Sequence, residues 1–404
     1  MTNCRICNYR LREIINLGKI ALVGNFLKKE TDQKKYKISL NYCISCKHVQ
    51  ISERLKPDLL FKYYLWETGV SKTNIFLLKS LLNKLMRLGI SKKSKILEIA
   101  SNDGSFIKIL KKKFNSFIIG VDPAKNLARK ANSKKIFTIN KYFDSKLTLV
   151  LKRKFSKFDF IFARNVIAHI KNPNTIFNGV EKLLSDDGVF ILEVPHLLNI
   201  LKDNQYDNIF HEHNGFHSLK SIVDLCKVNK LKIFDVDKID SQGGSLRCYI
   251  TKSKSEKKIS RKVKSLLKYE IKSKLFSTNE LKNFKFKIES HSKKLFNLIS
   301  ELKKKKKKIS IYGASGKGQA LMQFSQLNKN MIDFVFDKSK LKQGRFTPGT
   351  NIKIKSPEKI SKKNIDYLLI LSWNIKKEIM KQEKLFRKKG GKFIIPFPKP
   401  KIIN

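Results

Sequence analysis

The sequence is poor in acidic residues and lacks long apolar segments. Its 404 residues include 33 Asp and Glu against 87 Lys and Arg, which gives a formal net charge of +54. No apolar run approaches the ~20 residues that a membrane-spanning helix needs. The opening residues, MTNCRICNYR, lack the apolar core of a signal peptide. We therefore expect a cytoplasmic protein without a membrane partner.

The shortage of negative charge raises the question of nucleic-acid binding. Lysine is spread along the whole chain together with abundant Ile, Asn and Phe, which is typical of codon bias toward A and T acting on solvated faces. Aromatic residues do not alternate with basic clusters, as they would on a base-stacking surface. We favour the compositional explanation and expect no nucleic-acid partner. Attraction for anionic substrates follows in either case.

Cysteine is scarce, with only six in the chain. Four of them form two CxxC pairs, Cys4 with Cys7 and Cys43 with Cys46. This pattern matches a tetrahedral Cys4 zinc site, and disulfides are disfavoured in the cytoplasm. No His or carboxylate accompanies the pattern to suggest an open coordination position, so we expect structural zinc. The isolated Cys226 and Cys248 have apolar neighbours and are expected to be small buried residues.

Residues 96–122 carry the most informative local pattern. They predict a buried strand at 96–99, a tight loop at 100–104, a helix, and a second strand that ends at Asp122. Such a loop forms a ligand notch at the carboxyl end of the strand. Asp122 follows Gly104 by eighteen residues, about where an acidic side chain would meet a ribose diol.

The loop at 100–104 contains a single glycine, with Ala100 and Ser101 at its other small positions. This composition argues against a pyrophosphate pressed onto a glycine-rich turn. It suits a nucleoside ligand without phosphate, of which S-adenosylmethionine is the common one. An ordinary strand-helix turn with no ligand explains the window equally well.

The strand-helix pattern continues through residues 71–255. Further strands are predicted at 136–139, 158–163, 188–194, 231–236 and 246–251. Seven strands with the ligand loop after the first indicate an α/β fold, the doubly wound sheet of a class I methyltransferase. The aromatic segment FKYYLWETGVS at 61–71 would pack between domains, and a helix is expected at 74–88.

The rest of the chain predicts a helical segment and a further α/β domain. Residues 256–308 are strongly basic and helical, ending in six lysines at 303–308. From residue 309, strand, GASGKG loop and helix predict a second doubly wound domain, with strands ending at Asp337 and Trp373. The loop is too short between glycines for a nucleoside-triphosphate P-loop and lacks Ser or Thr after its lysine. We expect domains at 1–70, 71–255 and 256–404.

Titratable residues gather after the predicted strands of the central domain. Asn165 and His169 follow the fourth strand, Glu193 and His196 follow the fifth, and the segment FHEH at 210–213 comes next. Strand order places these groups at the carboxyl edge of the sheet. HEH is too short for the HExxH zinc motif, so no catalytic metal is assigned. A histidine with a pKa near neutrality can take a proton from a carbon acid.

Ten segments occur together, in order: CRIC with CISC, EIASNDGSF, GVDPA, ARNVIAHI, DNIFHEH, QGGSLR, YGASGKG, KQGRFTPGT, LILSWN and GGKFIIPFP. In this, the chain resembles the three-domain, S-adenosylmethionine-dependent sugar C-methyltransferases. Their substrates are nucleotide-linked 4-keto-deoxysugars. The resemblance implies an amino-terminal zinc-binding domain, a central cofactor domain and a carboxyl-terminal Rossmann-like domain, the last two enclosing the substrate. The chain departs from the family pattern at three positions. Phe210 stands where the family usually has Tyr, and Trp66 and Thr68 stand where the family tends to have Tyr and Ser.

The resemblance also implies roles for individual residues. His213 would be the general base that removes the proton beside the 4-keto group, with His169 and Glu212 beside it, and the resulting enolate would attack the methyl group. The zinc ligands would be Cys4, Cys7, Cys43 and Cys46. The cofactor would contact Glu98, Ser101, Asn102, Gly104 and Asp122, and Asn165 is a further candidate.

A nucleotide diphosphate, expected to be that of thymidine, needs cationic or N–H donors. Lys342, Arg345 and the loop from Gly313 to Lys317 are the candidates, because Arg, Lys and a helix start suit phosphate. Plain exposed charge explains Lys342 and Arg345 equally well. Two other functions compete with C-methylation: methylation of an oxygen or nitrogen acceptor, and nucleic-acid binding by a basic zinc protein without catalysis.

Overall fold

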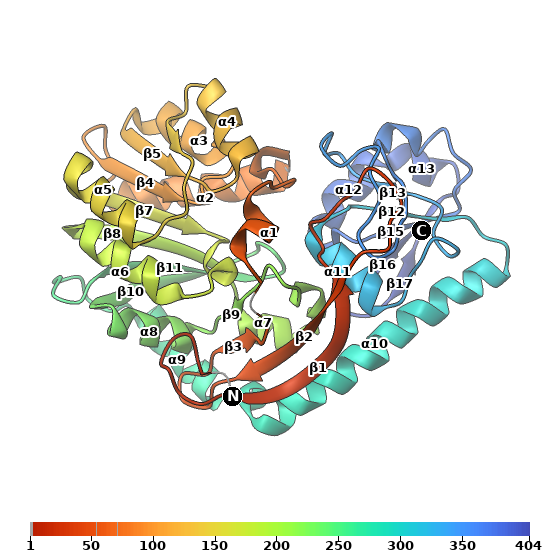
Figure 1. Cartoon of the computed structure of the whole chain (residues 1–404), viewed down its shortest axis with the longest axis horizontal. Helices are drawn as coiled ribbons and strands as arrows, with labels where there is room; N and C mark the ends of the chain where they lie inside the picture. The colour runs from red at the N-terminus through yellow and green to blue at the C-terminus, as the bar shows by residue number, and fades with distance from the viewer. Residues whose placement is uncertain (1–2, 54, 71) are drawn as a thin grey trace. The chain divides into compact units, whose positions relative to one another are not determined.

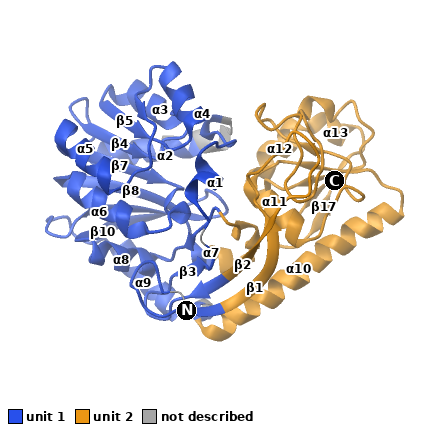
Figure 2. Cartoon of the chain, in the orientation of Figure 1, with its two compact units in different colours: residues 1–13, 40–198, 212–276 blue, residues 14–39, 199–211, 277–404 orange. Residues whose placement is uncertain are grey.

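The computed structural model describes residues 3–53, 55–70 and 72–404. The chain forms two compact units, coloured separately in Figure 2. Unit 1 comprises Met1–Glu13, Leu40–Leu198 and Glu212–Phe276, and unit 2 comprises Ile14–Ser39, Asn199–His211 and Ser277–Asn404. The units therefore divide residues 1–70, which the sequence suggests as one domain.

Unit 1 contains a seven-stranded sheet in the order β10-β11-β8-β7-β4-β5-β6 (Figure 1). The five strands from β8 to β6 are parallel, and β11 is antiparallel to both β8 and β10. The strands are β4 (Lys95–Ile99), β5 (Phe117–Val121), β6 (Thr138–Ile139), β7 (Phe158–Arg164), β8 (Leu184–Pro195), β10 (Leu231–Ile239) and β11 (Ser245–Lys252). All seven strands predicted from the sequence are present.

Alternating side chains of the strands fill two cores on opposite faces of this sheet. Leu97 and Ile99 of β4 belong to one core, while Ile96 belongs to the other. Helices cover both faces, as the near-continuous apolar strands require. These helices are α2 (Lys72–Arg87), α3 (Ser105–Phe114), α4 (Lys125–Ser133), α5 (Ser145–Phe155), α6 (Pro173–Leu183), α8 (Leu219–Val228) and α9 (Arg261–Lys272). The predicted helix at 74–88 is thus confirmed as α2.

A second, four-stranded sheet has the order β1-β2-β3-β9. Its strands are β1 (Arg12–Ala21), β2 (Lys35–Tyr42), β3 (Val49–Ile51) and β9 (Gly215–Phe216). Within unit 1, β3 pairs antiparallel with residues Leu40 to Tyr42 of β2 and with β9. The helices α1 (Pro57–Phe61) and α7 (Leu197–Lys202) follow β3 and β8 along the chain.

Unit 2 contains a six-stranded sheet in the order β14-β13-β12-β15-β16-β17, parallel except for β17. The strands are β12 (Ile309–Tyr312), β13 (Val335–Phe336), β14 (Ile354–Lys355), β15 (Tyr367–Ile370), β16 (Lys392–Ile395) and β17 (Lys401–Ile403). Its helices are α10 (Thr278–Lys304), α11 (Gly316–Phe324), α12 (Lys376–Gln382) and α13 (Lys384–Lys388). The strand expected to end at Trp373 stops at Ile370, because Trp373 begins a short 3-10 turn.

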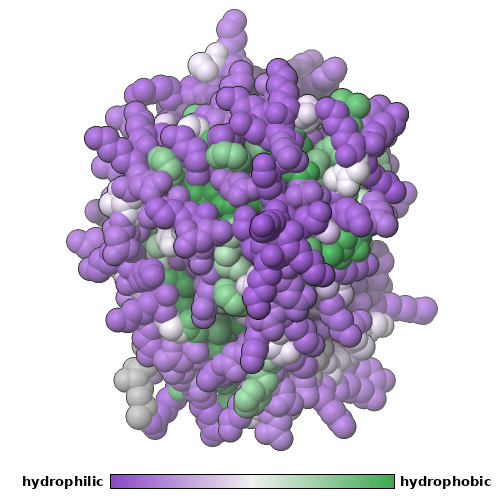
Figure 3. Space-filling model, turned by 90° about the vertical axis from the view of Figure 1, so that its right-hand side faces the viewer, coloured by the Kyte–Doolittle hydropathy of each residue, from purple (hydrophilic) through white to green (hydrophobic). Residues whose placement is uncertain are grey.

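The basic segment at 256–308, which the sequence predicts as a helical linker with a solvated face, is helical. Its helix α9 buries Val263, Leu266 and Glu270 within unit 1. Its helix α10 runs for 27 residues in unit 2 and buries eight of them. The remaining faces carry the lysines, and the face in Figure 3 is mainly hydrophilic with separate small apolar areas. Across the described ranges, no helix is both long and apolar enough to cross a membrane.

Candidate active site and metal centre

The four paired cysteines converge in unit 1. Their sulfurs all lie within 4.8 Å of one another, and Cys4 is 3.5 Å from Cys46, as Cys7 is from Cys43. Each CxxC turn is closed by a backbone hydrogen bond, from Asn8 N–H to Cys4 O and from Lys47 N–H to Cys43 O. Asn8 and Lys47 both have φ of 60°, which reverses the chain after the second cysteine of each pair.

This arrangement fits a tetrahedral zinc ion. Zinc with Zn–S bonds of about 2.3 Å holds its sulfurs roughly 3.8 Å apart, which agrees with the sulfur spacing here. Contacts among the thiols lower the pKa of Cys43 and raise the pKa of Cys4 and Cys46, so these sulfurs do not all ionise without a cation between them. With four sulfur donors the shell is complete, so the ion is structural and no position is left for substrate.

The loop after β4 has an unusual backbone. Ala100, Asn102 and Gly104 have φ of 57°, 55° and 71°, so three of five residues lie in the left-handed region, which costs energy for Ala100 and Asn102. Gly120 on β5 permits this path, since a β-carbon there would lie 2.5 Å from Ser101 Oγ. The packing therefore needs a second glycine, Gly120, which is remote from the loop in sequence.

Gly104 begins α3 and lies close to neighbouring side chains. A β-carbon at this position would come within 2.9 Å of Ile136 and 3.2 Å of Ala131. The side chain of Ser101 is buried, and its hydroxyl has no hydrogen-bond partner among the described residues. An unpaired buried hydroxyl in the loop is consistent with a ligand that supplies the partner.

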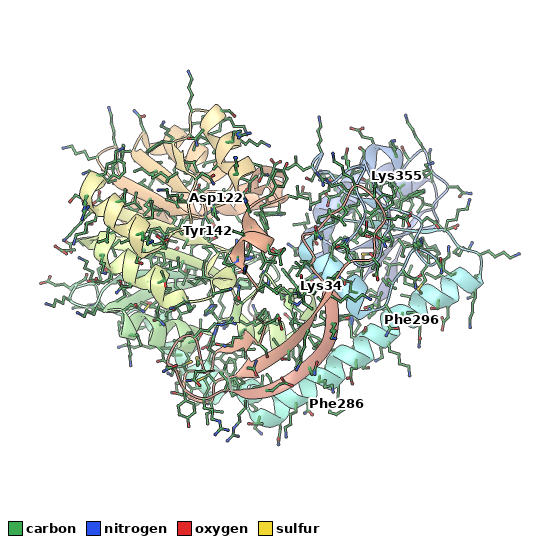
Figure 4. The ribbon with its side chains drawn as sticks, in the orientation of Figure 1. Lys34, Asp122, Tyr142, Phe286, Phe296 and Lys355 are labelled. Carbon is green, nitrogen blue, oxygen red and sulfur yellow. The ribbon has the colours of Figure 1, made fainter. Side chains whose placement is uncertain are left out.

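Asp122 follows β5 and fixes the loop. Its two carboxylate oxygens accept the N–H groups of Asn102, at 2.8 Å, and Ala124, at 2.9 Å. Burial raises the pKa of Asp122 to about 6 despite these hydrogen bonds. Because each carboxylate oxygen can accept a further hydrogen bond, the residue remains able to meet a ribose hydroxyl. Figure 4 shows Asp122 and Tyr142 beside α1 at one edge of unit 1.

Glu98, the residue before the last of β4, forms a buried ion pair that could not be predicted from the sequence. Its Oε1 accepts from Nη2 of Arg164 at 2.8 Å, and the guanidinium carbon of Arg164 lies 3.9 Å from the centre of the Phe106 ring. Among the described residues, Glu98 Oε2 and the side-chain oxygen of Asn165 are buried without partners. Burial raises the pKa of Glu98 to about 7, although Arg164 opposes the shift. A cationic ligand group would satisfy these oxygens.

A connector segment, residues 57–70, fastens to several loops of unit 1 (Figure 1). Tyr142 Oη donates to Asp58 at 2.8 Å, and Asn102 contacts the segment through Trp66 O, at 3.1 Å, and Thr68 N, at 2.9 Å. The sequence suggested packing between domains for 61–71, of which residue 71 lies outside the described ranges. Within unit 1 the segment makes hydrogen bonds with Asn102, Asn126 and Tyr142, and its packing between domains stays a prediction.

The connector segment also contacts the expected catalytic residues. Tyr64 Oη donates to Glu212 Oε2 at 3.0 Å, and the ring of Phe61 lies 5.6 Å from that of His169. His169 and His213 are edge to face, with ring centres 4.8 Å apart. Unit 1 thus brings together all three residues proposed for catalysis from the sequence. The contact of Tyr64 with Glu212 was not predicted, because a run of aromatic residues does not indicate which ring lies next to the catalytic candidates.

Tyr64, His169, Glu212 and His213 form the candidate catalytic cluster, called the catalytic cluster below. Its environment sets the protonation state of two of these groups, His169 and Tyr64. Burial lowers the pKa of His169 to about 4, so its imidazole is neutral at pH 7. Burial, reinforced by the charge of Glu212, raises the pKa of Tyr64 well above its ordinary value. The phenol therefore keeps its proton and donates to the carboxylate.

Three other groups that the sequence placed at this edge have separate partners. His196 Nε2 lies 2.6 Å from Glu270, which also accepts the N–H groups at the start of α8. Glu193 accepts from Arg247 Nε at 2.6 Å. His211 belongs to unit 2, where its Nε2 lies 3.2 Å from Lys37 O. Strand order predicted that these groups lie at the carboxyl edge of the sheet, and each of them has a partner that is distant in sequence.

In unit 2, the loop from Gly313 to Lys317 leads into α11. Gly313 has φ of 100°, and a β-carbon there would lie 2.3 Å from Ser372 Oγ. Lys317 is 9% exposed, with its ammonium 5.4 Å from the Trp373 ring centre. Trp373 Nε1 donates to buried Asp207 at 2.7 Å. Burial lowers the pKa of Lys317 and raises that of Asp207, and the charge of each opposes the shift of the other.

The side chains of Lys342 and Arg345 donate hydrogen bonds to backbone carbonyl groups rather than pointing to solvent. Lys342 Nζ donates to Ala314 O at 2.8 Å and lies 3.6 Å from Asp337. Arg345 donates to Leu341 O at 2.8 Å and to Phe26 O at 3.0 Å. Exposed charge, the alternative explanation for Lys342, is excluded by its 4% exposure. Lys342 therefore contacts the loop at Ala314, whereas Arg345 links the backbone at Leu341 to that at Phe26.

The strand order and the loop after β4 define a class I methyltransferase domain, here joined to a four-cysteine zinc centre. The chain matches a zinc binding domain over residues 4–61, a methyltransferase domain over 74–234 and a C-methyltransferase C-terminal domain over 240–398. It is also 30% identical over 406 residues to C-methyltransferase NovU of Streptomyces niveus, covering 99% of this chain and 96% of that protein.

The chain therefore belongs to the family of S-adenosylmethionine-dependent C-methyltransferases that combine these three domains. It uses S-adenosylmethionine as methyl donor and carries structural zinc. Among solved structures, cyclopropane synthase MmaA2 of Mycobacterium tuberculosis matches with 11% identity and a TM-score of 0.37, covering 49% of this chain and 92% of that one. An S-adenosylmethionine-dependent methyltransferase of Clostridium acetobutylicum matches with 15% identity and a TM-score of 0.35, covering 43% and 89%.

Proposed function

We propose that the protein methylates a carbon next to the ketone of a nucleotide-linked 4-keto-deoxysugar, with thymidine diphosphate as the expected nucleotide. One observation carries the proposal. The same connector segment contacts both the catalytic cluster and the loop after β4. Its Tyr64 belongs to the cluster, and its Trp66 and Thr68 bind Asn102 of the loop. A base and a methyl donor held by one structural element suit removal of a proton followed by methylation.

In this proposal His213 takes the proton from the carbon beside the ketone. The C–H electron pair then moves toward the ketone oxygen and leaves an enolate, whose carbon forms the new bond to the methyl group. Glu212 lies next to His213 in the chain and would stabilise the protonated imidazole. Neutral His169, which packs edge to face with His213, would hold that ring in place. When bound, S-adenosylmethionine would supply the electrophilic methyl group, and the electron pair of the broken S–CH3 bond would stay on its sulfur as the neutral thioether of S-adenosylhomocysteine.

The cofactor would occupy the notch lined by the loop after β4. Asp122 would accept from the ribose, and Glu98 and Asn165 offer buried oxygens to the cationic end. Ser101, Asn102 and Gly104 would shape the backbone around it. Four thiols that must stay reduced to bind zinc favour the cytoplasm as the place of action.

The nucleotide diphosphate would bind in unit 2 at the loop from Gly313 to Lys317. N–H groups at the start of α11 and the ammonium of Lys317 suit phosphate oxygens. Lys342 and Arg345 would act by fixing the loop and the segment around Phe26. The domain ranges 1–70, 71–255 and 256–404 would then serve zinc binding, cofactor binding and substrate binding, in that order.

Deuterium exchange tests the proton-transfer step separately from methyl transfer. A thymidine-diphosphate-linked 4-keto-deoxysugar is incubated with the protein in D2O without S-adenosylmethionine, and NMR follows the hydrogens beside the ketone. We expect deuterium to enter at one carbon with the wild type and not with His213→Ala. His211→Asn, two residues away with a partner in unit 2, is the matched control and should exchange normally. Exchange that persists in His213→Ala would remove His213 from this role.

The alternative is methylation of an oxygen or nitrogen. A complete reaction with 13C-methyl-labelled S-adenosylmethionine distinguishes it, because the chemical shift of the new methyl group separates C–CH3 from O–CH3 and N–CH3. We expect C–CH3 on the same carbon that exchanged deuterium. A methyl signal on oxygen or nitrogen would overturn the proposed chemistry.

A further inference from the structure

Asn126, in the first turn of α4, holds the backbone of Tyr64 from two sides. Its Nδ2 donates to Tyr64 O at 2.8 Å, and its Oδ1 accepts from Tyr64 N–H at 3.1 Å. The amide therefore satisfies both polar groups of one peptide residue in an irregular segment, as a neighbouring strand would. These two hydrogen bonds restrain the Tyr64 backbone and therefore also the position of its α-carbon, to which the phenol side chain is attached.

The other contacts of Tyr64 lead into the catalytic cluster. Its hydroxyl donates to Glu212 at 3.0 Å, and Glu212 is only 5% exposed. The backbone contact at Asn126 and the side-chain contact at Glu212 lie at opposite ends of the same residue. A shift of the backbone would move the hydroxyl away from a carboxylate that water reaches poorly.

We propose that Asn126 is a positioning residue for the methyl transfer: it acts through Tyr64 to set the hydrogen bond at Glu212 beside His213. The turnover measurement that tests this inference rests on the proposed function. The described hydrogen bonds of Asn126 do not reach Glu212 or His213. Asn126 would therefore affect the reaction only through Tyr64, which can be tested directly.

Loss of this contact should reduce the rate more than the binding of the methyl donor. A misplacement of about 1 Å in a catalytic group can cost about 100-fold in rate. We expect Asn126→Ala to lower kcat about 10- to 100-fold while the dissociation constant for S-adenosylmethionine, measured by calorimetry, changes less than about threefold. Asn126→Asp keeps the acceptor and loses the donor, so its loss of kcat should lie between those of wild type and Asn126→Ala.

The chain offers a matched control on the same helix. Asn132 makes the same double contact with the backbone of Thr138, donating to its carbonyl at 2.8 Å and accepting from its N–H at 3.0 Å. That contact fastens β6 and involves neither the connector segment nor the catalytic cluster. We expect Asn132→Ala to lower the melting temperature without changing kcat. Equal losses of kcat in Asn126→Ala and Asn132→Ala would overturn the proposal.

A double-mutant cycle tests whether Asn126 acts through Tyr64. If it does, Asn126→Ala should change kcat less than about twofold in a Tyr64→Phe background, because the hydroxyl it positions is already absent. Losses that multiply fully would show that Asn126 acts by another route, and would overturn the proposal.

Hydrogen exchange separates failure of this inference from failure of the proposed function. Amide exchange of peptides covering 57–70 needs no sugar substrate. We expect faster exchange there in Asn126→Ala, and not in Asn132→Ala. If exchange behaves so but the wild type does not turn over the keto-sugar, the proposed substrate is wrong and the backbone contact stands. Unchanged exchange in Asn126→Ala overturns the inference whatever the substrate.

Discussion

The guanidinium of Arg164 lies 2.8 Å from Oε1 of Glu98, at the carboxyl ends of the adjacent parallel strands β7 and β4. Both side chains are largely buried, with 11% and 2% exposure. The remaining Glu98 oxygen has no partner within the described part of the chain. Half of this carboxylate is therefore held by the protein, and half is open to a cationic ligand.

Removing Arg164 should destabilise the protein and weaken cofactor binding. Breaking a buried pair by removing one partner costs up to about 3–5 kcal/mol, and protonation of the Glu98 carboxyl that is left without its cation limits this cost. We expect Arg164→Ala to lower the free energy of unfolding by this amount, measured by chemical denaturation. S-adenosylmethionine should also bind more weakly per folded molecule, because Glu98 will hold its proton more firmly.

A second buried pair in the same sheet provides the control. Arg247 Nε lies 2.6 Å from Glu193, and the two side chains are 3% and 5% exposed. We expect Arg247→Ala to cost similar stability without altering cofactor affinity. Loss of affinity equal to that of Arg164→Ala would mean that general destabilisation, rather than Glu98, controls binding.

Cofactor affinity should rise with pH in the range around 6 to 8. Glu98 and Asp122 have pKa values raised by burial to about 7 and about 6, so both still hold protons in the free protein at acidic pH. A cationic ligand needs the ionised carboxylates. Each pH unit below the controlling pKa should therefore weaken binding about tenfold, and calorimetry in two buffers should detect release of protons on binding. Glu98→Gln should flatten the dependence near pH 7.

The raised pKa of Glu98 should have the opposite pH dependence in its effect on folding stability: stability falls with rising pH, whereas cofactor affinity rises. The Glu98 carboxyl ionises near 4.5 when unperturbed and near 7 in the folded chain. The folded state therefore binds the proton more tightly, and this contribution to stability is present below pH 4.5 and lost as pH rises through 7. Comparing denaturation of the wild type and Glu98→Gln at pH 5 and pH 8 would show it. A larger benefit of Glu98 at pH 8 would contradict the assigned cause.

Zinc should be stoichiometric and needed for the fold around it. The protein should contain one zinc per chain by elemental analysis, and Cys43→Ser should lose it, because a four-thiolate shell leaves no spare ligand. We expect chelation to lower the melting temperature sharply. Cys226→Ala removes a buried thiol outside the cluster and should retain the metal. Metal content unchanged in Cys43→Ser would exclude the assigned site.

Short-range patterns predicted much of this structure. The strand periodicity gave all seven strands of the larger sheet, and the CxxC spacing gave the metal cluster, because both signals depend on neighbours within a few residues. Interactions between distant residues could not be read in this way. Glu98 finds Arg164 across adjacent strands, and Gly120 is required by Ser101 only once the strands pair. Likewise, His196 and Glu193 are titratable residues that the sequence places at the same sheet edge as His213, but nothing in the sequence shows that His196 pairs with Glu270 and Glu193 with Arg247.

The loop from Gly313 to Lys317, which we propose binds the diphosphate, allows a last prediction that distinguishes two lysines with similar sequence signals. Lys317 lies in the second position of α11, whereas Lys342 donates to Ala314 O and lies beside Asp337. If Lys317 binds diphosphate, Lys317→Ala should raise KM for the nucleotide sugar about tenfold or more, with kcat and S-adenosylmethionine affinity little changed. The increase should shrink as salt rises, because added ions screen the lost attraction. Lys342→Ala should instead lower the melting temperature, since it leaves a buried carbonyl and Asp337 without their cation. A KM unchanged in Lys317→Ala, measured at low salt with the folded variant, would place the diphosphate elsewhere.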